Sequence, residues 1–152
     1  MIVCGLIFIL VCTGCGPLRV NQMQQHAARG DDAWIAVQPV DCDTPSRTCG
    51  QLHLIKGAAC LRLAESDRDP AGYFACAVDE LAAGLALTPS WKDAGERVEI
   101  LEKHCEALSG LQRLQSGKAS RETGQRLFDA ARALYRLSPG SVPAVYFISL
   151  AG

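Results

Sequence analysis

The chain has 152 residues, which is the length of about one domain. Its 15 Lys and Arg residues nearly balance 16 Asp and Glu residues, and this balance excludes a general nucleic-acid binder. A composition of 49% hydrophobic and 20% charged residues is that of a folded domain and excludes a disordered chain. Eight cysteines are more than a reduced cytosolic protein usually carries, so we expect a compartment that permits disulfides.

The N-terminal segment is an uninterrupted apolar run over residues 2–11, which Gly16 and Pro17 end. A membrane-spanning helix needs about 20 apolar residues, so this shorter run fits the core of a secretory signal peptide instead. Residues 13–15 (Thr-Gly-Cys) resemble the end of a bacterial lipoprotein signal, in which small residues precede a cysteine that is lipidated and becomes the mature N-terminus. The alternative is an ordinary cleaved signal peptide that leaves a soluble periplasmic protein.

This resemblance implies three parts of the chain. Residues 1–14 are expected to be the signal peptide, residues 15–48 a lipidated N-terminus and tether with a small packing segment, and residues 49–152 a helical domain. A covalent lipid on Cys15 is the one attached group we expect, and it anchors the protein to a membrane. In similar lipoproteins an aspartate after the cysteine favours the inner membrane. Gly16 stands there instead, so we expect the periplasmic face of the outer membrane.

Five cysteines follow Cys15 and are candidates for disulfides. Cys42 and Cys49 bracket the turn-forming stretch DTPSRT, and we predict a bridge between them. Cys60, Cys76 and Cys105 are spaced so that antiparallel helices would bring all three sulfurs to one level. Cys76 can then pair with either neighbour but not with both, and the alternative is that all three are small buried hydrophobes.

The sequence shows no metal or catalytic motif. No CxxC occurs, and His104 and Cys105 are neighbours on one predicted helix, so their side chains face different sides. Asp79 and Glu80 are also adjacent, which excludes shared acid–base work, and His53 fits a partly exposed surface histidine. GxSxG, HExxH, Walker and GxGxxG motifs are missing. We therefore expect no enzyme, no metal site and no small-molecule substrate.

Apolar residues at helical spacing predict an all-α domain from residue 50 onward. Helices are predicted from about residue 50 to the SDRDP turn, then over 70–87, 91–114 and 120–137. Ser46 or Thr48 is expected to cap the first helix, and Asp69 is expected to cap the second, with Pro70 in its first turn. Residues 143–151 predict a last short helix, with an edge strand as the alternative. Upstream, residues 20–28 predict a short polar helix, and the side chain of Trp34 is expected to be buried in the core.

Two stretches, residues 57–89 and 110–139, resemble degenerate tetratricopeptide repeats. The residues that match between them are Ala83, Gly84, Leu87, Thr88 and Pro89 in the first and Ala133, Leu134, Leu137, Ser138 and Pro139 in the second. The closing prolines are farther apart than the roughly 34 residues of the usual repeat. The resemblance implies helical hairpins stacked as a short TPR-like array whose concave face binds peptides or partner helices. A four-helix bundle is the alternative.

A basic face and the export signal shape the functional hypothesis. Arg121, Arg132 and Arg136 fall near one face of a predicted helix, where they could contact an acidic partner or lipid phosphates; a solvated face is the alternative. We expect a membrane-anchored periplasmic scaffold or adaptor lipoprotein that binds a protein partner in an envelope assembly, such as a secretion system (type VI) or pilus. The alternative is a soluble periplasmic binding or inhibitor module with a reactive free cysteine.

Overall fold

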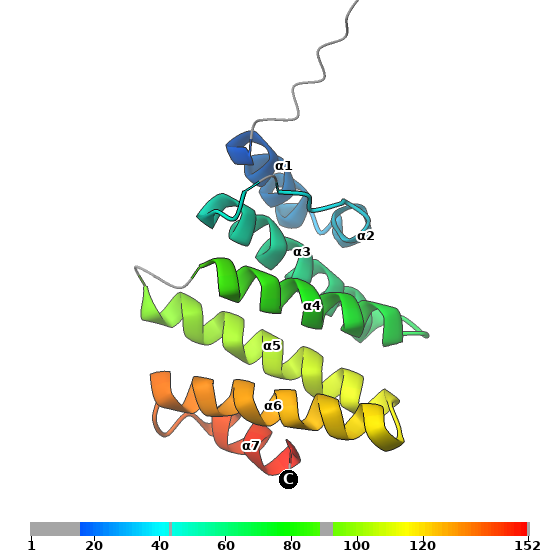
Figure 1. The fold of residues 1–152 in the computed structure, drawn as a ribbon. Coiled ribbons are helices and arrows are strands. Elements are labelled where there is room, and N and C mark those ends of the chain that lie inside the picture. The colour runs from blue at the N-terminus through cyan, green and yellow to red at the C-terminus, as the bar shows by residue number, and fades with distance from the viewer. Residues whose placement is uncertain (1–15, 43, 89–92, 152) are drawn as a thin grey trace, which may run out of the picture.

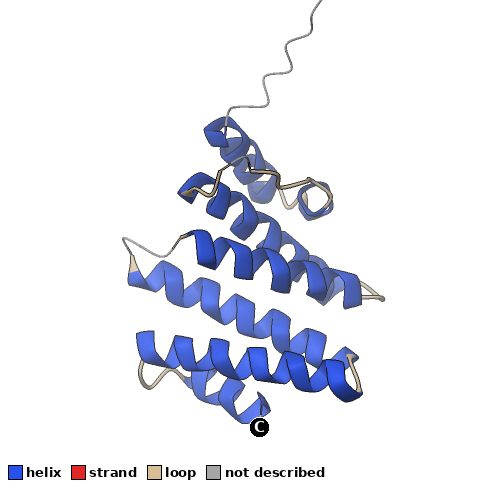
Figure 2. Cartoon of the chain, viewed as in Figure 1, coloured by secondary structure: helices blue, strands red, loops and turns tan. Residues whose placement is uncertain are grey.

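The computed structural model describes residues 16–42, 44–88 and 93–151, and the regular structure in these ranges is entirely helical (Figures 1 and 2). The all-α fold predicted from the sequence is confirmed. The helices are α1 (Gly16–Ala28), α2 (Asp32–Ala36), α3 (Arg47–Ser66), α4 (Ala71–Leu87), α5 (Ala94–Leu114), α6 (Gly117–Leu137) and α7 (Val142–Ala151). From α3 to α7 the helices stack in chain order as antiparallel hairpins, each packing mainly on its neighbours along the chain, while α1 and α2 pack mainly on α3.

Helices α3 and α4 pack closely because glycines lie where they cross. A Cβ atom at Gly57 would lie 2.7 Å from Leu81 Cγ, and one at Gly84 would overlap the side chain of Leu54. Neither helix could approach the other this closely with a larger residue at these positions. A disulfide between Cys60 and Cys76 also joins the two helices.

The caps of the first hairpin only partly match the prediction. Ser46 caps α3, since its hydroxyl oxygen accepts a hydrogen bond from the Cys49 backbone N–H at 3.1 Å. The prediction that Asp69 caps α4 was wrong. Its backbone N–H donates to the Asp67 carboxylate at 2.9 Å, and Pro70 is the residue that precedes the helix. The Asp67 side chain therefore organises the turn before α4 begins.

The next hairpin, α5 with α6, differs from the prediction mainly at its helix starts. Asp93 caps α5 by accepting from the Gly95 backbone N–H at 2.8 Å, while the predicted start at residues 91–92 lies outside the described residues. Helix α6 begins at Gly117, three residues before the predicted Ser120. Gly117 has a φ of 59°, a conformation that glycine adopts without strain.

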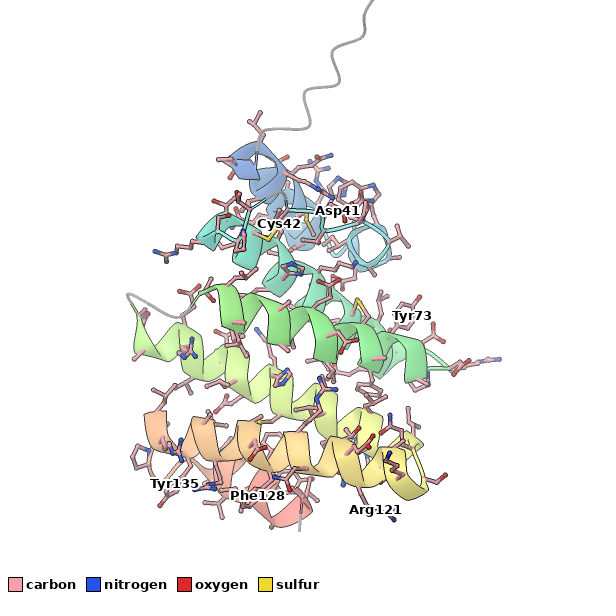
Figure 3. All side chains as sticks on the ribbon, in the orientation of Figure 1. Asp41, Cys42, Tyr73, Arg121, Phe128 and Tyr135 are labelled. Carbon is pink, nitrogen blue, oxygen red and sulfur yellow. A yellow bond between two sulfur atoms is a disulfide. The ribbon has the colours of Figure 1, made fainter. Side chains whose placement is uncertain are left out.

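The main core runs continuously from α3 to α7. Its largest fully buried side chains are leucines of α4, α5 and α6, namely Leu81, Leu108, Leu127 and Leu134. The structure buries Leu134, while Tyr135 is 44% exposed on the outer side of α6 (Figure 3).

The N-terminal helices form a second, smaller core with α3. Val20 and Met23 of α1 and Ile35 of α2 are buried against Leu52 and Ala59 of α3. The sequence assigned residues 15–48 to a tether with a small packing segment. In the structure the packing segment covers most of this stretch, because both helices lie on α3 (Figure 1).

Helix α7 is the predicted last short helix rather than an edge strand. It packs through Ala144 and Phe147, while Val142 and Tyr146 are 78% and 52% exposed. Across the part of the chain that the structure describes, no helix is both long and apolar enough to cross a membrane.

Candidate partner-binding groove

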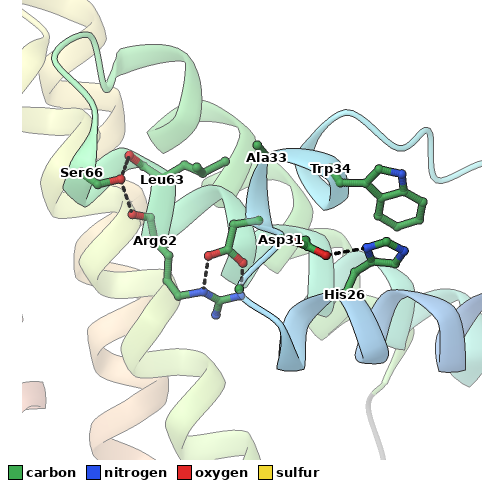
Figure 4. A pocket seen from close by; sticks show the side chains of 9 residues that line it. His26, Asp31, Ala33, Trp34, Arg62, Leu63 and Ser66 are labelled. Carbon is green, nitrogen blue, oxygen red and sulfur yellow. Dashed lines mark hydrogen bonds and ion pairs between the residues drawn. The ribbon is translucent and has the colours of Figure 1, made fainter.

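Two hollows lie on the surface of the array, and the first is formed by α1, α2 and α3 (Figure 4). Its volume is about 620 Å³. The Arg62 guanidinium donates to both carboxylate oxygens of Asp32, at 2.9 and 2.6 Å, and this hydrogen bonding raises the pKa of Arg62. His26 pairs with Asp31 at 3.0 Å and stacks on Trp34 with 3.8 Å between ring centroids. The Arg62–Asp32 pair therefore joins α2 to α3, while the His26 contacts join α1 to α2.

The second hollow lies where α3, α5 and α7 line one face of the array, and we call it the α3/α5/α7 groove. Its volume is about 510 Å³. Helix α5 contacts both α3 and α7, so alternate helices of the array meet on this face. The groove has an acidic wall from α3 and α5 and an apolar wall from α7, with Phe74 of α4 also in its lining.

The acidic wall consists of Glu65 on α3 and Glu102 and Glu106 on α5. Glu102 and Glu106 are one helical turn apart and therefore share a face of α5. None of the ion pairs between described residues involves these three carboxylates. Desolvation raises the pKa of Glu106, and the charges of Glu65 and Glu102 raise it further. The wall thus carries negative charge that no ion pair among the described residues neutralises, although Arg113 also lines the groove and the charge of Lys103 acts to lower the pKa of Glu106.

The apolar wall comes from the N-terminal half of α7. Val142 and Tyr146 are one turn apart and strongly exposed, whereas the neighbouring Phe147 is only 6% exposed and fixes the helix to the core. An exposed valine and tyrosine on a rigid helix, next to a hollow, offer apolar area that a binding partner could cover. The two walls together suit an amphipathic ligand.

The predicted basic residues lie on a different helix. Arg121, Arg132 and Arg136 are exposed on α6, as the helical spacing predicts, and none of them lines the groove. Arg132 lies over the Phe128 ring at 5.6 Å from its centroid. Figure 3 labels Arg121, Phe128 and Tyr135 along α6.

The candidate cysteines divide into two bridges and one free thiol in the described part of the chain. Cys42 pairs with Cys49, the predicted bridge, and Cys76 pairs with Cys60, one of the two pairings that its spacing allowed. Cys105 is free and fully buried, and burial, followed by the charges of nearby glutamates, raises its thiol pKa to about 12. The predicted lipidation site, Cys15, lies outside the described residues.

Sequence reasoning missed two groups of residues. It did not single out the three glutamates of the groove, because Glu65 lies on a different helix from Glu102 and Glu106. It also missed the grouping of Cys42, Cys49 and His53, whose ligand atoms all lie within 4.8 Å of one another. The signal there was the Cys49 to His53 spacing of one helical turn, because only CxxC and the His104–Cys105 pair were weighed.

Comparison with known proteins yields no match: no family model, curated protein or solved structure is significantly similar to the chain. The functional argument therefore depends on the groove and the sequence signals alone.

Proposed function

We propose that the chain is a lipid-anchored periplasmic adaptor of the outer membrane, and that its α3/α5/α7 groove binds a protein partner in an envelope assembly. A secretion system, such as type VI, or a pilus is the kind of assembly we have in view. The observation that carries the proposal is the pairing of unneutralised carboxylates with exposed apolar side chains in one groove.

This groove favours an amphipathic partner segment with basic residues along one edge. Lys or Arg side chains of the partner would pair with Glu65, Glu102 and Glu106, which steers association and fixes orientation. Apolar side chains of the same segment would cover Val142 and Tyr146, since a helix lying in a groove buries one apolar face. The partner, rather than a residue of the adaptor, would then supply the missing positive charge.

Export and anchoring are supported by the sequence signal and by the cysteines. Two disulfides in the described residues suit an oxidising compartment, which the periplasm is. Each buried methylene of an attached acyl chain contributes about 0.8 kcal/mol, and several chains on Cys15 would hold the domain at the bilayer.

The second candidate, a soluble module with a reactive free cysteine, receives less support. Thiolate is the reactive form of cysteine, and a buried thiol whose pKa is about 12 is almost entirely protonated at neutral pH. Cys105 is also fully buried, so a large disulfide partner has no direct access to it. These properties favour the adaptor.

Charge reversal in the groove tests the binding proposal. The test variant is Glu65→Lys, Glu102→Lys and Glu106→Lys, and the matched control is Glu96→Lys, Glu122→Lys and Asp129→Lys, with the same charge change at exposed positions outside the groove. Affinity purification from detergent-solubilised membranes should recover a partner with the wild type and the control but not with the groove variant. Equal recovery with both variants would contradict the proposal.

The anchor has a separate test. With Cys15→Ser, the protein should move from the membrane fraction to the soluble periplasmic fraction, while its circular dichroism spectrum stays that of the wild type. Wild-type protein that already fractionates as soluble would contradict the lipid anchor but not the groove, so the two parts of the proposal fail separately.

A further inference from the structure

A second site lies at the opposite part of the array from the groove's α7 wall, where the loop before α3 meets the start of that helix. Cys49 and His53 are one turn apart on α3, so both side chains face the same side. The disulfide brings Cys42 to that face, and Figure 3 shows it next to Asp41 beside α1 and α3. One ligand atom from each of Cys42, Cys49 and His53 lies within 4.8 Å of the others.

The His53 ring is already oriented by a carboxylate. Its Nδ1 lies 2.5 Å from Glu80 Oε2 on α4, and Glu80 Oε1 also accepts from Lys56 Nζ at 2.8 Å. A carboxylate paired with lysine only accepts hydrogen bonds, so Nδ1 donates its N–H to Glu80, and Nε2 is the ring nitrogen that could bind a metal ion. Histidines that bind metals commonly donate their other ring N–H to a carboxylate in this way, which fixes the tautomer.

We propose that Cys42, Cys49 and His53 form a Zn²⁺ site when the Cys42–Cys49 disulfide is reduced. Two thiolates and one imidazole are ligands that Zn²⁺ prefers, and water completes a tetrahedral set. In the oxidised protein the two sulfurs are bonded to each other and cannot bind the ion. The disulfide and the zinc complex are therefore alternative ways to close the same loop onto α3.

Conversion between the two states requires a dithiol reductant. One thiolate of the reductant attacks Sγ of half-buried Cys42, the S–S bond breaks, and Cys49 leaves as a thiolate near the N-terminus of α3, which stabilises negative charge. The second thiol of the reductant resolves the mixed disulfide. Two electrons and two protons pass to Cys42 and Cys49, and the reductant becomes a disulfide. Zn²⁺ binding then displaces the two thiol protons, and the two thiolate charges balance the charge of the ion.

The test uses the full chain with the other cysteines replaced by serine, so that thiols elsewhere bind no metal. The replaced residues are Cys4, Cys12, Cys15, Cys60, Cys76 and Cys105. After reduction with a phosphine, Co²⁺ should bind with one equivalent and give thiolate-to-cobalt charge transfer and tetrahedral d–d absorption. Zn²⁺ should displace it, and the oxidised chain should give neither band.

Point variants assign the third ligand and its carboxylate partner. His53→Ala should weaken Zn²⁺ binding by at least about 100-fold, and Glu80→Gln by about 10-fold, since carboxylates behind a ligand typically contribute this much. His26→Ala is the matched control, because His26 also pairs with a carboxylate, Asp31, but does not belong to the group of ligand atoms around the two sulfurs. It should bind Zn²⁺ as the parent does.

Two results would overturn the proposal. One is equal Zn²⁺ affinity with and without His53, and the other is no Co²⁺ spectrum from a reduced chain that circular dichroism shows to be folded. If the multiple-serine chain does not fold, reduced wild type is compared with Cys42→Ser plus Cys49→Ser. The wild type should then bind one more equivalent of Zn²⁺ than this variant, and equal stoichiometry would refute the site.

Discussion

The hollow formed by α1, α2 and α3 and the α3/α5/α7 groove are of similar size but differ in what their charged groups do. In the first hollow, charges pair with each other across the helices that form it, as Arg62 does with Asp32. In the α3/α5/α7 groove, three carboxylates form no ion pair with a described residue, and Tyr146 is exposed beside them. The charged groups of the first hollow therefore stabilise the fold, whereas the carboxylates of the groove are the groups that we propose bind a partner.

The largest effect on stability is expected at α7, where a buried residue and its exposed neighbour can be compared. Phe147→Ala should lower the free energy of unfolding by about 3 to 4 kcal/mol, because a buried phenylalanine leaves a cavity under α7. Tyr146→Ala, at the neighbouring exposed position, should change stability by less than about 0.5 kcal/mol. Urea denaturation of both variants measures the difference, and similar losses would show that Tyr146 belongs to the core.

The next largest effect is the pH dependence of stability that comes from His104 on α5. His104 is buried, its Nδ1 has no hydrogen-bond partner among the described residues, and burial with the charge of Arg126 lowers its pKa to about 4. The unfolded chain therefore takes up a proton on His104 near its ordinary pKa of about 6.5, before the folded protein does. Its contribution to stability is complete above that pH and is lost as the pH falls towards 4.

Replacing His104 with leucine should remove this pH dependence. The wild type should lose on the order of 3 kcal/mol between pH 7 and pH 4 relative to His104→Leu, given the size of the pKa change. Denaturation at several pH values, compared between the two proteins, isolates this term from the other titrating groups. Parallel curves for the two proteins would contradict the neutral buried histidine.

A smaller effect is expected when the ion pair in the hollow formed by α1, α2 and α3 is removed. Arg62 is about half exposed while Asp32 is mostly buried, so a double-mutant cycle of Arg62→Ala and Asp32→Asn should give a coupling of about 1 kcal/mol. The same cycle on the exposed pair Lys118 and Glu122 is the control and should give close to zero. Equal couplings would mean that the ion pair of the hollow does not hold α2.

The smallest effect should come from the groove itself, with the opposite sign. Because desolvation raises the pKa of Glu106, its charge opposes folding above that pKa, and Glu106→Gln should stabilise the protein by a few tenths of a kcal/mol at pH 7. Once Glu106 is protonated at low pH, the gain should disappear. Thermal unfolding at pH 7 and pH 4 measures this, and a loss of stability at pH 7 would mean that Glu106 is paired within the protein.

Local sequence signals predicted most of the helices but few of the contacts between them. The apolar spacing from residue 50 onward and the cap at Ser46 found α3, because both depend on neighbours along the chain. Helix α1 was predicted as a polar segment, since only Val20 and Met23 mark its buried side and the partners that bury them lie on α2 and α3. Pattern alone could not supply that contact.

The site was harder to predict for the same reason. The spacing of Cys76 allowed two partners, and only the packing of α4 on α3 selects Cys60 over Cys105. Glu102 and Glu106 follow the pattern of a solvated helix face, and what distinguishes them is Glu65 on another helix. Long-range proximity of like charges has no signature within a single helix.

The most direct test of the central claim is photo-crosslinking in intact cells from a reactive residue at position 146, with position 135 as the control. Tyr146 and Tyr135 are exposed to similar extents, but only Tyr146 lines the groove. We expect position 146 to yield a discrete crosslinked protein that disappears when Glu65, Glu102 and Glu106 are changed to lysine, and position 135 to yield none. The same adduct from both positions, or one that survives the charge reversal, would contradict a partner bound in the α3/α5/α7 groove.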